Sequence, residues 1–274
     1  MPELPEVETV ARALRRAGLE GRVITGCACR CAKLRRPLPA AELQKSVGAA
    51  ILAIERRAKY LLFRLTDGRI LLLHLGMTGT LRLDEPKTPA GRHDHFDLLF
   101  DDGRILRLRD PRKFGLVALS RPAADGLVPE LANLAPEPLS DAFSGEYLYR
   151  VSRGRKTPIK VFIMDQRRVV GVGNIYASES LFRAGIRPSL PAGRLSRPRC
   201  RKLAAAIREI LEAAIAAGGT TISDFHSLDG SEGAFVRTLK VYGRAGEPCP
   251  DCGRPLKKSV LGGRSTFFCS GCQR

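Results

Sequence analysis

Residues 60–75, YLLFRLTDGRILLLHL, and residues 96–110, FDLLFDDGRILRLRD, decide the fold of the first half of the chain. Each stretch joins two apolar runs through an Asp-Gly turn, which is the pattern of a β-hairpin. The Asp-Gly-Arg-Ile-Leu shared by both is reused turn chemistry, because the flanking residues do not match. Short strand patterns continue from Val23 to Leu119 with no helix pattern between them, which favours a β-sandwich or a barrel.

Helical patterns lie on both sides of this strand-rich part. Apolar residues recur at helical spacing over residues 4–18, after a proline suited to a first turn. A proline-rich stretch at 121–138 then predicts the domain boundary. Beyond it we expect helices over residues 157–166, 175–185 and 196–219, so the second half is an α-domain.

Four of the eight cysteines form a metal-binding pattern at the C-terminus. Two Cys-x2-Cys pairs are separated by sixteen residues, and their members are Cys249, Cys252, Cys269 and Cys272. This spacing is typical of a tetrahedral zinc site, and four thiolates leave no coordination position open for water. We therefore expect one structural Zn²⁺. Cys27, Cys29 and Cys31 alternate along a predicted strand, and we interpret them as core residues.

Composition points to a polyanionic partner. The 274 residues include 46 Lys and Arg against 28 Asp and Glu, for a formal net charge of +18. The hydrophobic and charged fractions, 44% and 27%, are those of a globular protein and exclude a disordered chain. No apolar run is long enough for a membrane span and no signal peptide is visible, so we expect a cytoplasmic protein with no membrane partner.

Four motifs occur here in the order known from one family: PELPEVET at 2–9, DPRKFG at 110–115, GVGNIYASESLF at 171–182, and the cysteine quartet. The chain resembles bacterial formamidopyrimidine-DNA glycosylases over essentially its whole length. The resemblance implies a two-domain α+β fold, in which an N-terminal β-sandwich is flanked by helices and a helix-two-turn-helix domain carries a zinc-finger hairpin. The expected ranges are 1–130 for the catalytic domain, 131–225 for the helical domain and 236–274 for the zinc finger.

The resemblance also implies an activity. Family members are bifunctional glycosylases and abasic-site lyases of base excision repair that excise 8-oxoguanine and formamidopyrimidines through an N-terminal proline Schiff base, followed by β,δ-elimination. The expected partner is double-stranded DNA containing oxidised bases or abasic sites. We expect a monomer that is associated with the bacterial nucleoid through DNA.

The implied catalytic residues are Pro2, Glu3, Lys59 and Glu6. An N-terminal amine has an ordinary pKa of about 8, so part of it is neutral and nucleophilic once Met1 is removed. Glu3 matches the family's acid/base carboxylate, and Lys59 its active-site lysine. Three of the four have a plainer interpretation: Pro2 starts a helix, Glu6 complements the helix dipole, and Lys59 is a surface lysine.

The implied DNA contacts lie in both halves of the chain. Met77, Arg112 and Phe114 match the side chains that fill the gap left by an everted nucleotide, although Met77 and Phe114 also suit a hydrophobic core. The expected phosphate contacts are His74, Lys160, Asn174 and Arg264, of which Asn174 also suits an ordinary helix cap. Residues 220–225 resemble the loop that covers the lesion, with Thr220, Thr221 and Ser223 as its candidates.

Three other functions remain open at this point, of which a zinc-ribbon RNA-binding protein ranks last because aromatic residues make up only 6% of the chain. The sister family, which prefers oxidised pyrimidines, shares the terminal Pro-Glu and the zinc finger, but PELPEVET and DPRKFG favour the purine enzyme. A non-catalytic damaged-DNA-binding protein would need only the helical module and the zinc hairpin, and the presence of Pro2, Glu3 and Lys59 speaks against it.

Overall fold

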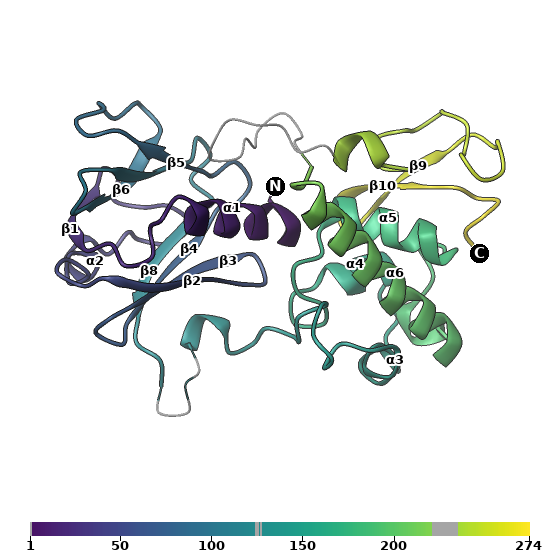
Figure 1. The fold of residues 1–274 in the computed structure, drawn as a ribbon. Coiled ribbons are helices and arrows are strands. Elements are labelled where there is room, and N and C mark those ends of the chain that lie inside the picture. Colours follow the sequence, from purple (N-terminus) through teal and green to yellow (C-terminus); the bar gives the residue numbers. More distant parts are fainter. Residues whose placement is uncertain (1, 124–125, 127, 221–234) are drawn as a thin grey trace. The chain divides into compact units, whose positions relative to one another are not determined.

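The computed structural model describes residues 2–123, 126, 128–220 and 235–274. These residues divide into two compact units (Figure 1). The first contains the residues up to Ala132 together with Gly218–Thr220, and the second contains Asn133–Ala217 together with Phe235–Arg274. Within the described ranges, no helix combines the length and the apolar character needed to cross a bilayer.

The first unit is a β-sandwich with helices at its edge. One antiparallel sheet has the strand order β2-β3-β4-β8 and the other β1-β6-β7-β5. The helices and strands of this unit are α1 Leu4–Arg16, β1 Ile24–Cys29, α2 Ala40–Gln44, β2 Ile51–Arg57, β3 Tyr60–Leu65, β4 Ile70–His74, β5 Thr80–Asp84, β6 Asp94–Phe100, β7 Ile105–Arg109, β8 Leu116–Ser120 and the 3-10 turn Pro129–Leu131. The two separate sheets confirm the predicted sandwich, and the alternative of a closed barrel is wrong.

Both predicted hairpins are present and share their turn chemistry. Strands β3 and β4 pair antiparallel, as do β6 and β7. In the first turn the Asp67 carboxylate accepts the backbone N–H of Arg69 at 3.0 Å, and in the second Asp102 accepts that of Arg104 at 3.1 Å. The repeated Asp-Gly-Arg therefore forms the same turn, with the same hydrogen bond, in both hairpins.

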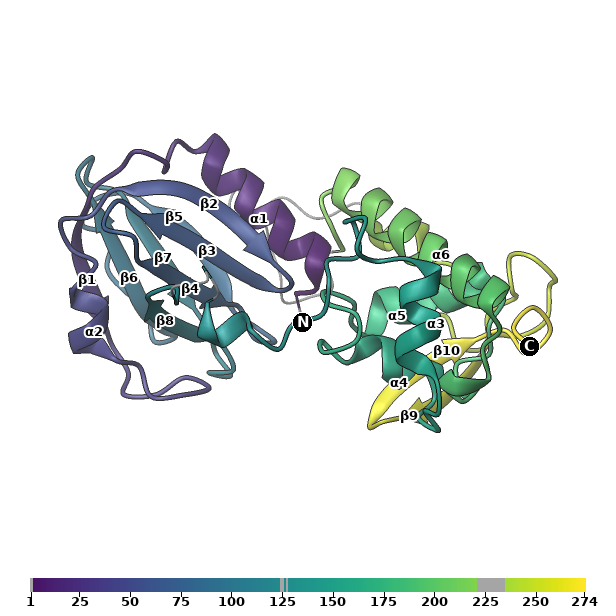
Figure 2. The same ribbon diagram turned by 90° about the horizontal axis from the view of Figure 1, so that it is seen from below.

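Helix α1 closes one edge of the sandwich. Its apolar face, with Val7, Val10 and Leu14, is buried in the core between the sheets, and the helix runs beside β2 (Figure 2). The strand cysteines lie at the margin of this core and are half-buried. Burial raises the pKa of the Cys27 thiol to about 12, so this side chain behaves as a small apolar group.

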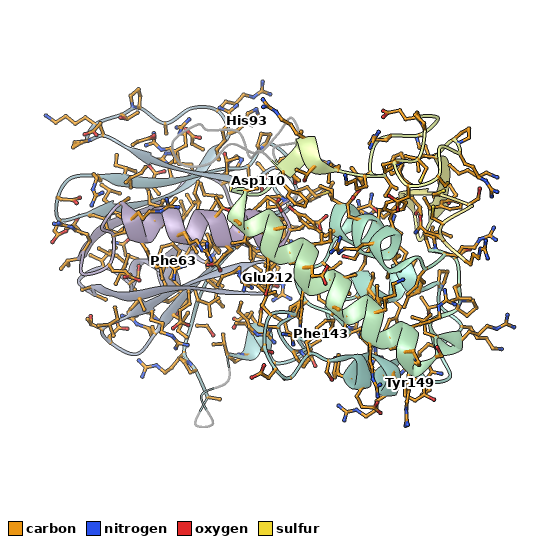
Figure 3. All side chains as sticks on the ribbon, turned by 45° about the vertical axis from the view of Figure 1, so that its right-hand side comes forward. Phe63, His93, Asp110, Phe143, Tyr149 and Glu212 are labelled. Atoms are coloured by element: carbon orange, nitrogen blue, oxygen red, sulfur yellow. The ribbon has the colours of Figure 1, made fainter. Side chains whose placement is uncertain are left out.

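The second unit contains helices and one hairpin. Its elements are α3 Gly145–Ser152, α4 Ile159–Met164, α5 Asn174–Ala184, the 3-10 turn Ala192–Arg194, α6 Arg197–Ala216, the 3-10 turn Phe235–Thr238, β9 Lys257–Leu261 and β10 Arg264–Phe268. Strand β10 packs against α5 (Figure 1). Figure 3 labels one core residue of each unit, Phe63 and Phe143, both fully buried.

Candidate functional site

The N-terminal corner of the first unit holds the predicted Pro2-Glu3 pair. Both residues are buried where α1 begins. The Glu6 carboxylate accepts the backbone N–H of Glu3 at 2.8 Å through Oε2. Its other oxygen, Oε1, accepts the N–H of Thr220 at 2.8 Å and the Thr220 hydroxyl at 3.0 Å. Glu6 therefore ties the residue that follows Pro2 to the start of the expected lesion loop.

Gly219, next to Thr220, has a positive φ and lies close to the Glu6 carboxylate. A Cβ added at Gly219 would lie 3.0 Å from Glu6 Oε1, and Gly219 has a φ of +84°. The glycine is therefore required both for the turn and for the close approach of Glu6. Thr221 and Ser223, like Met1, lie outside the described residues.

Lys59 occupies the tight turn between β2 and β3 and is buried. The turn places Ala58 at a φ of +54°, a conformation that an L-residue adopts at a cost of about 1 kcal/mol. The Lys59 ammonium is close enough to His74, on the neighbouring strand β4, to oppose protonation of its ring.

His74 is held in its neutral form. Burial, with the nearby charges of Arg35 and Lys59, lowers its pKa from 6.5 to about 3. Its Nδ1 accepts the N–H of Gly76 at 2.9 Å and lies 3.0 Å from the Arg35 guanidinium. Because Nδ1 accepts, the proton resides on Nε2, so His74 has one N–H to offer a ligand.

The residues predicted to fill the gap of an everted nucleotide lie on two loops, which one buried carboxylate holds together. Asp110 accepts the Thr78 hydroxyl at 2.8 Å and the Gly115 N–H at 2.7 Å. The loops touch backbone to backbone, since a Cβ at Gly76 would lie 2.4 Å from the carbonyl carbon of Phe114. Met77 and Phe114 are thus carried by one rigid double loop.

The tip of this double loop exposes an aromatic ring and a cation. Phe114 is 41% exposed, which is unusual for a large apolar side chain. The Arg112 guanidinium lies 4.8 Å from the centre of the Phe114 ring, within cation–π range. The alternative that Phe114 is a core residue is inconsistent with this exposure.

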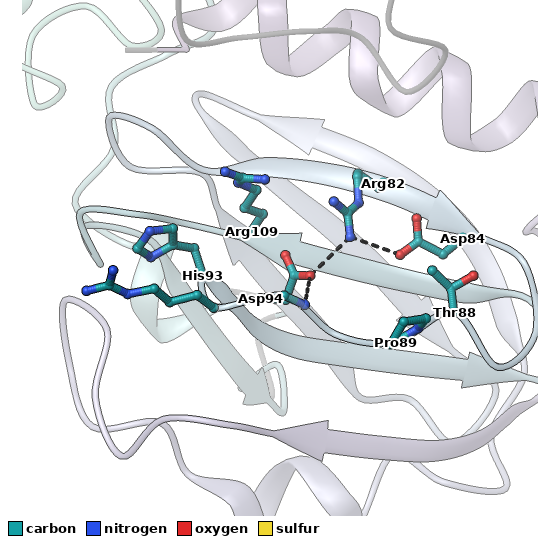
Figure 4. A pocket seen from close by; sticks show the side chains of 9 residues that line it. Arg82, Asp84, Thr88, Pro89, His93, Asp94 and Arg109 are labelled. Carbon is teal, nitrogen blue, oxygen red and sulfur yellow. Dashed lines mark hydrogen bonds and ion pairs between the residues drawn. The ribbon is translucent and has the colours of Figure 1, made fainter.

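A pocket of about 500 Å³ adjoins the double loop (Figure 4). Three arginines, Arg82, Arg92 and Arg109, line it together with His93 and two aspartates. Both aspartates are engaged: Arg82 donates to Asp84 and to Asp94, each at 3.1 Å. Sequence reasoning missed this basic pocket, because its residues come from three strands and a loop and form no contiguous motif.

In the second unit, three of the predicted residues lie around one hairpin. Asn174 is the first residue of α5, and Arg264 is an exposed residue that opens β10. Lys160, on α4, is 0% exposed, and its ammonium donates to Asn174 Oδ1 at 2.6 Å. The burial of Lys160 could not be predicted, because nothing in the residues around it distinguishes it from a surface lysine.

Sequence reasoning also missed Glu179, which is buried in α5. Its carboxylate accepts three consecutive backbone N–H groups, those of Lys240, Val241 and Tyr242, at 2.8–3.0 Å. This is the geometry of an anion held in a backbone nest. The signal that could have revealed it is an acidic residue inside the otherwise small and apolar run IYASESLF.

The cysteine quartet has the geometry of a zinc site. All four Sγ atoms lie within 4.8 Å of one another; Cys249 and Cys272 are 3.8 Å apart, and Cys252 and Cys269 are 3.4 Å apart. Tetrahedral zinc with Zn–S bonds of about 2.3 Å separates its sulfurs by about 3.8 Å, so the four thiolates fit this ion.

The two cysteine turns are alike. The N–H of Gly253 donates to the carbonyl of Cys249 at 2.9 Å, and that of Gln273 to Cys269 at 3.1 Å. Burial opposes ionisation of Cys269, but N–H donors from the turn and the neighbouring thiols outweigh it and lower its pKa to about 7. At Cys269 the turn therefore favours the thiolate form that a metal binds, whereas burial raises the pKa of Cys249 and the neighbouring thiols raise that of Cys272.

Comparisons with known proteins agree with this architecture. Residues 1–117 match the model of the formamidopyrimidine-DNA glycosylase N-terminal domain, residues 134–226 that of its H2TH domain, and residues 246–274 that of the zinc finger found in FPG and IleRS. The formamidopyrimidine-DNA glycosylase of Alkalilimnicola ehrlichii is 54% identical over 282 residues, with full coverage of both chains.

Solved structures show the same fold. The crystal structure of the MutM (Fpg) protein from Thermus thermophilus is 41% identical, with a TM-score of 0.88 and coverage of 99% of this chain and 98% of that one. A mutant Lactococcus lactis Fpg in complex with Fapy-dG-containing DNA is 33% identical, with a TM-score of 0.87 and full coverage of both chains.

A β-sandwich, an H2TH domain and a four-cysteine finger in one chain define a class of protein, the DNA glycosylases of base excision repair. Within that class, the chain belongs to the formamidopyrimidine-DNA glycosylase family. The resemblance seen in the four sequence motifs is thereby confirmed.

Proposed function

We propose that this chain is a bifunctional DNA glycosylase and abasic-site lyase that removes oxidised purines from double-stranded DNA. The N-terminal corner carries the proposal, because Pro2 and Glu3 are buried there and Glu6 fixes the backbone between them and the helix. The complex of a mutant Lactococcus lactis Fpg with Fapy-dG-containing DNA supports formamidopyrimidines as substrates.

Pro2 supplies the nucleophile once Met1 is removed. Its neutral secondary amine attacks C1′ of the damaged nucleotide, the bond from C1′ to the base breaks, and the departing base takes up a proton. The attached nitrogen loses its proton, and O4′ takes up a proton as the sugar ring opens, which gives a cationic iminium. Loss of a C2′ proton then expels the 3′ phosphate, and a second elimination expels the 5′ phosphate. Water finally hydrolyses the iminium, which frees the Pro2 amine and releases the sugar remnant. Glu3 carries protons between these steps as the general acid and base.

Phosphate contacts on the first unit position the strand for this attack. Lys59 provides a buried cation, and His74 a neutral Nε2–H donor. The basic pocket beside the double loop, with three arginines and two aspartates, extends this anion-binding surface.

Access to C1′ requires eversion of the nucleotide, which costs a few kcal/mol of lost stacking. Met77, Arg112 and Phe114 offset this cost by filling the gap. The exposed Phe114 ring provides a stacking face, and Arg112 offers donors to the unpaired base opposite. Asp110 keeps the two loops in register while they are inserted.

The second unit contributes further phosphate contacts. Asn174 at the start of α5 and Arg264 on the hairpin are its proposed phosphate ligands. Cys249, Cys252, Cys269 and Cys272 would hold a zinc ion whose contribution is to fix the hairpin that carries Arg264. Four thiolates leave that ion no open position, so its role is structural.

A comparison of two Glu→Gln variants tests the proposal. We expect Glu3→Gln to lower single-turnover release of 8-oxoguanine from a duplex by about 10²–10⁴-fold, because general acid–base catalysis contributes that much. DNA affinity should stay within about twofold. Glu42→Gln, at an exposed position of α2, is the matched control. Base release by Glu3→Gln at the rate of the control would refute the assignment.

A further inference from the structure

The most completely buried cation in the second unit is Lys160. Its side chain is 0% exposed, and Nζ donates to Asn174 Oδ1 at 2.6 Å, to the carbonyl of Ser265 at 2.8 Å and to the Thr266 hydroxyl at 2.8 Å. An ammonium has three N–H donors, and three acceptors meet them here. Direct binding of a phosphate by Lys160 would require at least one of these bonds to break and the side chain to leave its buried position.

The contact with Lys160 sets the orientation of the Asn174 amide. An amide has one acceptor oxygen and one NH₂ donor, and its two orientations differ only in which of them faces a given partner. Because Oδ1 accepts from the ammonium, the Nδ2 group is turned away from it, and Nδ2 donates to the Tyr242 hydroxyl at 3.4 Å. An Asn174 in the opposite orientation would point NH₂ at a cation and is disfavoured.

The surroundings of the amide are rigid. The nest on Glu179 holds the backbone of Tyr242, and the Tyr242 ring packs edge-on against Phe267 with centroids 5.1 Å apart. The other two acceptors of Lys160 belong to β10, which ends immediately before Cys269. A Cβ at Gly262, at the hairpin tip, would lie 3.0 Å from Val161, so the hairpin also packs closely on α4. Lys160 is thus anchored on a strand that is itself held by pairing and by the cysteine turns.

We propose that Lys160 is a positioning residue: it is anchored on β10 and fixes the Asn174 amide with its NH₂ group as the donor toward a DNA phosphate. This replaces the direct phosphate contact that the sequence suggested for Lys160, and it rests on the proposed phosphate role of Asn174. Since Asn174 is neutral, losing its contact weakens binding without changing the number of counterions released.

DNA binding by four variants tests the proposal. Lys160→Met, Asn174→Ala, the double variant and the control Lys202→Met, at an exposed position of α6, are titrated with lesion-containing duplex at several salt concentrations. We expect Lys160→Met and Asn174→Ala each to lose about tenfold in affinity, which is the scale of one hydrogen bond to a charged group. The double variant should lose no more than Asn174→Ala alone, and the salt slope should not change.

A direct contact gives a different pattern. If Lys160 itself neutralised a phosphate, the slope of log K against log salt would fall by about one and the losses of the two single variants would multiply. Either result overturns the proposal.

Two measurements without DNA separate this proposal from the phosphate role of Asn174. In the protein carrying bound zinc, the side-chain NH₂ signal of Asn174, assigned by its absence in Asn174→Ala, should move in Lys160→Met and stay in Lys202→Met. An unmoved signal refutes the positioning role, whatever happens to DNA affinity. A moved signal together with full DNA affinity of Asn174→Ala supports the positioning role and refutes the phosphate contact.

A further variant, Asn174→Asp, covers the case in which Lys160→Met does not fold. Asn174→Asp places a carboxylate against the Lys160 ammonium, so we expect it to unfold at a temperature no lower than Asn174→Ala, with a weaker affinity for DNA. An Asn174→Asp protein less stable than Asn174→Ala would show that the ammonium is not paired with position 174, and would overturn the proposal.

Discussion

At the scale of single residues, His74 shows how burial and neighbouring charges select a chemical form. The ring is surrounded by apolar strands and lies near two cations, so its positively charged form is disfavoured. Its folded-state pKa is about 3 against an ordinary value of 6.5. Between these values the unfolded chain binds the extra proton, so the His74 contribution to stability falls as the pH drops from about 6.5 toward 3.

An NMR titration measures this pKa directly. We expect the His74 ring to remain neutral, with its proton on Nε2, at every pH above about 4. Arg35→Met should raise the pKa only part of the way to 6.5, because burial is the larger cause and the Arg35 charge the smaller. A His74 ring that titrates near 6.5 in the unmodified protein would contradict the assigned environment.

At the scale of elements, the double loop illustrates a contact that only glycine permits. Gly76 has a φ of +66°, and an added Cβ would lie 2.4 Å from the backbone of Phe114. Gly68, in the β3–β4 turn, has a φ of +79° but nothing within 4 Å of an added Cβ. The two positions therefore separate backbone strain from steric overlap.

Alanine substitution at these two glycines measures both effects by urea unfolding. Gly68→Ala should lower the free energy of unfolding by about 1 kcal/mol, the cost of a left-handed alanine. Gly76→Ala should cost about 3 kcal/mol or more, because the overlap forces Met77 and Phe114 apart as well. Equal losses at the two positions would mean that the loops are not in backbone contact.

The same elements show what the sequence could predict. Alternating apolar runs and Asp-Gly turns predicted both hairpins, because a hairpin depends on residues close together in the chain. The Gly-Val-Gly-Asn turn likewise predicted helix α5, but the alternative that Asn174 caps it is wrong, because Gly173 is the N-cap and Asn174 is the first helical residue. The first-turn position of Glu6 was visible, but its bond to Thr220 was not, because that contact spans 214 positions.

The burial of Lys160 and the nest on Glu179 were hidden for the same reason. Each depends on segments that only the folded chain brings together. The cysteine quartet is the opposite case, because two local turns contain all the information about the site. Spacing alone therefore predicted the metal, and geometry agrees with it.

At the scale of the whole molecule, two compact units carry separate parts of the proposed site. The first holds the Pro2-Glu3 corner, Lys59, His74 and the double loop, and the second holds Asn174, Arg264 and the zinc turns. A net charge of +18 is distributed over this chain, which suits binding to a polyanion. The chemistry itself depends on a single atom, the nitrogen of Pro2.

Borohydride trapping shows whether the Pro2 nitrogen is the nucleophile. The protein is incubated with a duplex carrying 8-oxoguanine opposite cytosine, and borohydride reduces any iminium that forms to a stable crosslink. Mass spectrometry then locates the crosslinked residue. We predict a covalent adduct at Pro2 in the native protein, and less adduct with Pro2→Gly than with the native protein at the same short reaction time. Tight lesion-selective binding without any adduct would contradict the mechanism and indicate a damage-binding protein, and trapping only on oxidised pyrimidines would contradict the proposed substrate.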